Sequence, residues 1–95
     1  MYVVVRSYSG QGASELFDLI EKSEKEIREL ISRVPGFVTY AAFRSGDGGT
    51  TVTVCQDKAG TDESSKRAAG WIKDNASGTS VSPPQIIEGS TVLQF

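Results

Sequence analysis

The chain has 95 residues, of which 38% are hydrophobic and 23% charged, a balance typical of a folded globular protein. This length supports one hydrophobic core, so we expect a single domain over residues 1–95. Ten Lys and Arg against twelve Asp and Glu give a net charge of -2, which offers no broad basic surface to nucleic acid.

The use of cysteine and histidine restricts the chemistry. Cys55 is the only cysteine and histidine is absent, so no intramolecular disulfide can form and the commonest nitrogen ligand for transition metals is missing. We expect no metal site and no cofactor, and we expect Cys55 to be a small buried hydrophobic residue. Arg6 interrupts the opening apolar run, and no stretch has the length of a signal segment or membrane span. These features predict a cytoplasmic protein without membrane contact.

The N-terminal half begins with a strand and a long helix. Residues 1–9 are rich in β-branched and aromatic types and lead into Ser9-Gly10-Gln11-Gly12, which predicts a strand ended by a turn. Because Glu15 occupies the position of the third glycine in a dinucleotide-binding motif, the glycines indicate a simple turn. Apolar residues then recur at spacings of three and four, which predicts an amphipathic helix from about 13 to 34, ended by Pro35-Gly36.

The second half contains a hairpin, a helix and a last strand. Segments 37–44 and 50–56 are β-prone and flank the Gly-rich turn 45–49. A helix is expected over 61–76, with Thr61 or Asp62 as its N-cap and Trp71 at the edge of its inner face. The other residues of that face are expected to be Ser65, Ala68, Ile72 and Ala76. A polar linker leads to a strand over 85–95 with a bulge at Gly89.

This order predicts an α+β, ferredoxin-like βαββαβ fold: a four-stranded antiparallel sheet with two helices on one face. Both sides of the first strand are apolar, with Val3 and Val5 on one side and Tyr2, Val4 and Tyr8 on the other. The second strand is expected to place Phe37, Ala41 and Phe43 opposite Val38, Tyr40 and Ala42. An apolar second face predicts a homodimer in which two sheets pair into an α/β barrel; the alternatives are a monomer with an apolar surface, or a surface for another protein.

Three segments together carry a family resemblance: Tyr2-Val3-Val4-Val5, Val34-Pro35-Gly36-Phe37-Val38-Thr39-Tyr40 and Ser64-Ser65-Lys66-Arg67-Ala68-Ala69-Gly70-Trp71-Ile72. The chain resembles the antibiotic biosynthesis monooxygenase-like group of dimeric α/β-barrel proteins. The resemblance implies cofactor-free oxidation of polycyclic aromatic substrates or oxidative haem degradation, besides members with no known activity. It makes Trp71 a loose counterpart of the active-site tryptophan of the oxygenases. The haem activity fits badly, because those enzymes use a histidine iron ligand.

Two sets of residues are candidates for a ligand site. Ser23 falls in the apolar stripe of the first helix, so Ser23, Tyr40 and Trp71 are candidates to line a cavity for a flat, apolar ligand. Alternatively, Ser23 bonds its i−4 carbonyl and permits close helix packing. Tyr8, Tyr40 and Arg44 are candidates to share one sheet face and donate hydrogen bonds to an enolate; alternatively, the tyrosines are core or interface residues and Arg44 is a surface charge. No catalytic residue can be named.

Three functions therefore remain open from the sequence. They are a cofactor-independent oxygenase acting on a small aromatic or polycyclic compound, a non-catalytic small-molecule carrier or sensor, and a dimeric interaction module. The oxygenase is favoured, because dioxygen reacts directly with an electron-rich carbanion and the protein needs few distinctive residues to assist it.

Overall fold

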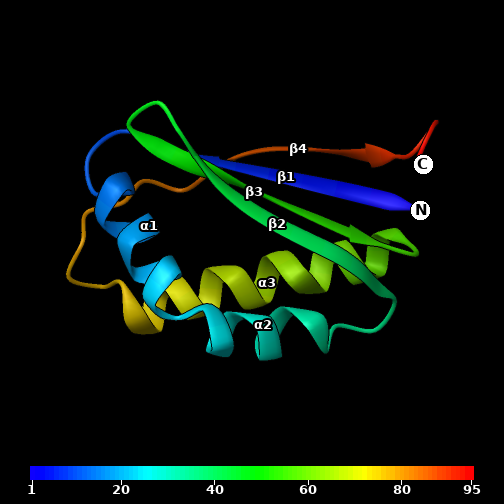
Figure 1. Ribbon diagram of the computed structural model, residues 1–95, viewed down its shortest axis with the longest axis horizontal. Coiled ribbons are helices and arrows are strands. Elements are labelled where there is room, and N and C mark those ends of the chain that lie inside the picture. The colour runs from blue at the N-terminus through cyan, green and yellow to red at the C-terminus, as the bar shows by residue number, and fades with distance from the viewer.

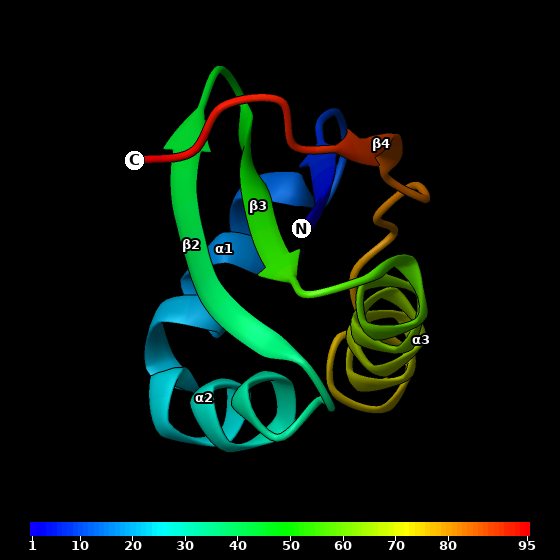
Figure 2. The same cartoon turned by 90° about the vertical axis from the view of Figure 1, so that its right-hand side faces the viewer.

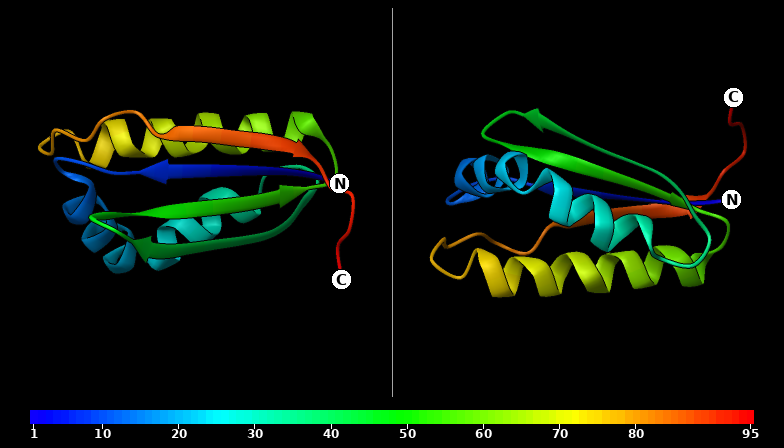
Figure 3. Two further views of the ribbon diagram at one scale, coloured as in Figure 1. Left: turned by 90° about the horizontal axis from the view of Figure 1, so that it is seen from above. Right: turned by 60° about the horizontal axis from the view of Figure 1, so that its bottom comes forward.

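The computed structural model describes all 95 residues and forms one four-stranded antiparallel sheet with every helix on the same face (Figure 1). The elements are β1 (Tyr2–Tyr8), α1 (Ala13–Lys22), α2 (Glu24–Ser32), β2 (Phe37–Ser45), β3 (Gly48–Cys55), α3 (Lys58–Asn75) and β4 (Gln85–Ser90). The strand order β2-β3-β1-β4 confirms the expected ferredoxin-like α+β fold. The view from above shows no element over the other face (Figure 3). None of the helices is both long and apolar enough to cross a membrane.

The first helical region is divided at Ser23, where a continuous helix over 13–34 was expected. Ser23 has φ −108° and ψ 24°, although its N–H still donates to the carbonyls of Leu19 and Ile20. Serine is a weak helix former because its side chain competes for backbone groups. The division lets α1 and α2 approach the sheet at different angles, with α2 below β2 and beside α3 (Figure 2).

The start and the inner face of α3 also differ from expectation. The prediction of Thr61 or Asp62 as N-cap is wrong: α3 begins at Lys58, and the Asp57 carboxylate caps it by accepting from the Gly60 N–H at 3.1 Å. Trp71 is buried, with 8% of its surface exposed, and does not lie at the edge. Three residues of the expected inner face do face the interior, since Ala76 is in the core and Ala68 and Ile72 line the space beside it, but packing turns the helix so that the large Trp71 ring enters the core as well.

The strands present the expected residues on each face, except at the start of β2. Pairing places Tyr2, Val4 and Tyr8 toward the helices and Val3 and Val5 outward, as predicted. The expected bulge at Gly89 is wrong, since Val3 pairs there in regular register.

An irregularity between Phe37 and Thr39 in β2 takes its place. It moves Phe37 to the helix side with Tyr40, whereas Ala41 and Phe43 face outward. β3 begins at Gly48, after the turn Gly46–Asp47, and β4 ends at Ser90 instead of continuing to residue 95.

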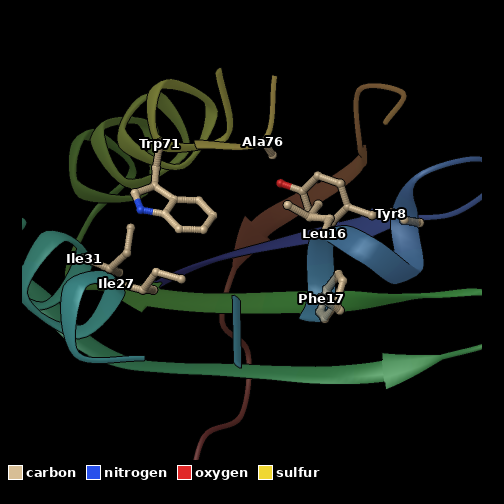
Figure 4. Close-up of a cluster of buried hydrophobic side chains, with 8 residues drawn as sticks. Tyr8, Leu16, Phe17, Ile27, Ile31, Trp71 and Ala76 are labelled. Carbon is tan, nitrogen blue, oxygen red and sulfur yellow. The ribbon is translucent and has the colours of Figure 1, made fainter. Parts of the chain in front are cut away.

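The core lies between the helices and the sheet. In Figure 4 the Trp71 ring extends from α3 toward Ile27 and Ile31 of α2, and Tyr8 and Leu16 lie across the core from it. The other residues of this buried core are Ala13, Phe17 and Ala76.

Glycine at position 60 allows α3 to approach β3 closely. A Cβ on Gly60 would lie 2.8 Å from Cys55 Cβ and 2.9 Å from the Pro35 carbonyl oxygen, while a Cβ on Gly70 of the same helix would meet nothing within 4 Å. We expect Gly60→Ala to lower the free energy of unfolding by about 1–3 kcal/mol through overpacking. The matched change Gly70→Ala should raise it by about 0.5–1 kcal/mol through helix propensity. Urea denaturation measures both; equal effects of the two changes would contradict this close packing.

Candidate functional site

An apolar hollow lies between the helices and the sheet, and we call it the inner cavity. Its volume is about 30 Å³, enough for a water molecule or two. The lining residues come from β1, α1, α2, β2, β3 and α3: Tyr8, Ile20, Ile27, Leu30, Ile31, Tyr40, Thr51, Ala68, Trp71 and Ile72. Three of the ten carry a hydroxyl group, so the inner cavity combines apolar walls with a few polar groups, as ligand sites do.

Two larger clefts adjoin the inner cavity. The β2 cleft, of about 480 Å³, shares Ile20, Ile27, Ile31 and Tyr40 with it and opens between α1, α2 and β2. The β4 cleft, of about 330 Å³, shares Tyr8 and Ile72 with it and lies between α3, β4 and the preceding loop. Both volumes are in the range of small-molecule sites, so a ligand could enter the inner cavity from either side once lining side chains move.

Arg6 places a positive charge in the protein interior. It lies on the helix side of β1, with only 2% of its surface exposed. Its Nη1 donates to Thr51 Oγ1 at 3.3 Å and Thr53 Oγ1 at 3.2 Å, and its Nη2 donates to Thr53 Oγ1 at 3.3 Å and Ser64 Oγ at 3.0 Å. The Nε has no partner.

No carboxylate pairs with this guanidinium. Arg28, Arg44 and Arg67 each contact one within 3.0 Å, whereas the acceptors around Arg6 are all neutral hydroxyls. An arginine stays protonated at neutral pH, and burying a charge without an opposite charge is costly. The inner cavity therefore lies one hydroxyl away from an uncompensated cation, because Thr51 both lines it and accepts from Arg6.

Burial keeps the two cavity tyrosines neutral. It raises the pKa of Tyr8 and of Tyr40, while the Arg6 charge acts in the opposite direction on both; no hydrogen bond contributes to either pKa shift. Both groups are therefore phenols at neutral pH, able to donate a hydrogen bond to an anion but unable to act as bases.

A carboxylate on α2 holds the indole of Trp71. The Nε1–H donates to Glu26 Oε1 at 2.6 Å, joining α3 to α2 across the inner cavity. This charge-assisted bond satisfies the only polar group of the ring and leaves its apolar face free to line the cavity.

The structure brings three of the five predicted site residues together and separates the other two. Tyr8, Tyr40 and Trp71 all line the inner cavity. Ser23 lies at the junction of α1 and α2, on a polar surface hollow lined by charged residues. Arg44 does share the helix-side face with the two tyrosines, but it is exposed and pairs with Asp18 Oδ1 at 2.6 Å and Glu21 Oε1 at 2.9 Å, tying β2 to α1.

Sequence reasoning missed the polar groups behind the inner cavity. The alternation Val4-Arg6-Tyr8 places Arg6 on the helix side, so the strand period contained this signal. The hydroxyls of Thr51 and Thr53 alternate in the same way along β3. Glu26 had no local signal, because its partner is 45 positions away. Cys55 is buried and burial raises the pKa of its thiol, which disfavours a nucleophilic thiolate.

Solved structures share this fold, although no family model and no curated protein matches the chain. HapK from Hahella chejuensis has a TM-score of 0.70 at 13% identity, covering 100% of this chain and 96% of that one. The Streptomyces coelicolor monooxygenase ActVA-Orf6, in complex with nanaomycin D, has a TM-score of 0.67 at 18% identity, covering 99% and 89%. The chain has the fold of the antibiotic biosynthesis monooxygenase-like proteins. At these identities the likeness establishes the fold, so the chemistry must come from this chain's own residues.

A third similar structure tests whether haem fits. The heme-degrader MhuD from Mycobacterium tuberculosis, with two hemes in its active site, has a TM-score of 0.69 at 14% identity, covering 100% of this chain and 99% of that one. The present chain has no histidine and no cluster of three metal-binding side chains. The raised pKa values of Tyr8 and Tyr40 also disfavour the phenolate that would bind iron. These residues do not fit a haem ligand set.

The tyrosine environment predicts a loss of stability in alkali. A raised pKa in the folded state means that the unfolded chain loses the phenol proton first, so the free energy of unfolding falls as pH rises above about 10. In the Tyr40→Phe variant, the free energy of unfolding should fall less steeply than in the parent protein between about pH 9 and pH 11. Urea unfolding across this range measures the slopes, and identical slopes would show that Tyr40 titrates as in the unfolded chain.

Proposed function

We propose that the protein is a cofactor-independent monooxygenase-like protein that binds a small, flat aromatic compound in the β2 cleft and inner cavity. The observation that carries the proposal is the apolar inner cavity that contains two neutral phenols and lies beside the uncompensated charge of Arg6. Its own volume is too small for a ring, so the ligand occupies the β2 cleft and displaces Tyr40 or Trp71 to reach inward. The nanaomycin complex of ActVA-Orf6 supports this ligand class.

The residues favour an anionic form of the ligand. The positive charge of Arg6 lowers the pKa of an acidic hydroxyl or ring C–H bound nearby, and the Tyr40 and Tyr8 hydroxyls stabilise the resulting enolate by donating to its oxygen. No carboxylate lines the inner cavity, so the substrate must be acidic enough to lose its proton to water or to the rim of the β2 cleft, where Glu21 and Glu24 lie.

Such a carbanion can react with dioxygen without a cofactor. For an anthrone-type substrate, one oxygen atom converts the ring CH2 to a carbonyl and the other leaves as water with the two hydrogens removed. The substrate supplies all four electrons, so the balance needs no external reductant. The protein contributes binding, enolate stabilisation and exclusion of water.

The test is oxygen uptake with 1,8-dihydroxyanthrone, corrected for the reaction without protein, together with thermal shift on the same samples. Removing the donor in Tyr40→Phe should lower kcat/KM about tenfold or more. Trp71→Phe should also lower it, because phenylalanine cannot donate to Glu26 and the ring at this position is no longer fixed. Tyr2→Phe, outside the cavity, is the control. A thermal shift without oxygen uptake would instead identify a carrier, and absence of both would refute the proposal.

We also propose that the outer face of the sheet pairs with a second copy of the chain. Cross-strand pairing aligns Ala41, Val52, Val5 and Ile87 in one row across all four strands on that face. Phe43 and Ile87 are 51% and 69% exposed, and no element of the chain covers them. An apolar face this continuous favours burial against an identical face.

A charge in the middle of this row should prevent pairing. We expect Val52→Lys to halve the mass measured by multi-angle light scattering, because the ammonium groups of both copies would be buried. Ser14→Lys, on the exposed side of α1, should leave the mass unchanged. A monomeric parent protein would contradict the homodimer directly.

A further inference from the structure

The β4 cleft differs chemically from the inner cavity. Its charged lining residues are two cations, Arg6 and Lys73, and it contains no acid. The chain as a whole has two more acids than bases, so the charge of the cleft opposes that of the protein. Such a local excess of positive charge, walled by low-dielectric residues, attracts small anions.

Neither cation has an anionic partner within the chain. Arg6 donates only to hydroxyls and leaves its Nε unpaired, and Lys73 forms no salt bridge, whereas Lys58 on the same helix pairs with Asp62 at 2.9 Å. Four of the five N–H groups of Arg6 are held by Thr51, Thr53 and Ser64, which fixes the guanidinium without neutralising it. A buried charge prepared in this way is stabilised by an anion brought from outside.

The remaining walls indicate the rest of the ligand. Most are apolar and come from α3, β4 and the loop between them: Ala69, Ile72, Val81, Pro83, Pro84 and Ile86. Tyr8, Ser65 and Ser82 add hydroxyls. The two prolines restrict the backbone of the loop, and the volume of about 330 Å³ suits a molecule of one ring or a short chain.

We infer that the β4 cleft binds a small organic acid, with its carboxylate toward Arg6 and Lys73 and its apolar body against Ile72, Pro84 and Ile86. Arg6 and Tyr8 also serve the proposed oxygenase site, but the two sites can be tested separately, since Tyr40 and Trp71 do not line this cleft and Lys73 does not line the inner cavity. The Nε–H of Arg6 is the one guanidinium group left to donate to the carboxylate, and the ammonium of Lys73 adds a second positive charge.

Benzoate is the probe, and its neutral isostere benzamide is the matched ligand control. Isothermal titration calorimetry in a buffer without carboxylates should give a benzoate affinity at least tenfold above that of benzamide, decreasing with added salt. In two-dimensional NMR spectra, benzoate should shift the backbone amides of Val81, Ser82, Gln85 and Ile86. Equal affinity for the two probes would overturn the inference, because the charge would then contribute nothing.

Variants locate the anion. Lys73→Gln should weaken benzoate binding several-fold, while Lys66→Gln, on the same helix but outside the cleft, should not. Arg6→Met should abolish it; because this variant leaves the hydroxyls of Thr51, Thr53 and Ser64 without their donor, circular dichroism is used to check that it folds.

If Arg6→Met does not fold, the effect of Lys73→Gln and the comparison with benzamide still test whether the β4 cleft binds a carboxylate. If Tyr40→Phe weakens benzoate binding and Lys73→Gln does not, the acid occupies the inner cavity and the inference is wrong. The absence of oxygen uptake with the anthrone substrate would refute the proposed function but would not affect the benzoate-binding result.

Discussion

The charge of Arg6 inside the helix–sheet layer is the constraint on which the rest of the interior depends. A guanidinium with 2% exposure requires acceptors, and the chain supplies Ser64 from α3 together with Thr51 and Thr53 from β3. The two threonines stand at strand positions where a sheet core usually carries Val or Ile. These bonds join β1, β3 and α3 at one point. These hydroxyls accept from both Nη groups but leave Nε unpaired and do not neutralise the charge, so the interior stays electropositive. The proposed ligand sites in the inner cavity and the β4 cleft are therefore expected to favour anions over neutral molecules.

The division of the first helical region at Ser23 shapes those hollows. Because α1 and α2 point in different directions, α2 runs beside α3 below the sheet (Figure 2). The Trp71 ring of α3 packs there near Ile27 and Ile31 of α2 (Figure 4). The Glu26–Trp71 bond spans that space and sets the position of the indole. A straight helix over the same residues would place its apolar stripe along one line and leave one end of the sheet uncovered.

The two faces of the sheet differ in their chemistry. The helix side carries Arg6, Tyr8 and Tyr40, groups that can recognise an anionic ligand. The outer side is almost entirely aliphatic along the row through Val52, which suits burial against another sheet but offers no chemistry. Period-two alternation separates the residues of the proposed ligand site from those of the proposed pairing face within the same strands, so an outward substitution changes one set and leaves the other intact.

Local patterns in the sequence determined the order of the elements, the two faces of β1 and the meeting of Tyr8 with Tyr40, because strand and helix periods depend only on neighbouring residues. The break at Ser23, the bulge after Phe37 and the turning of α3 toward Trp71 were decided by packing. The hydroxyl partners of Arg6 lie 45 to 58 positions away along the chain. Alternation alone indicated that Arg6 faces inward, but only the tertiary structure shows that no carboxylate meets it there. Whether a charge is compensated depends on which groups the fold brings within a few ångströms of it. The number of residues between two groups in the sequence does not predict that distance.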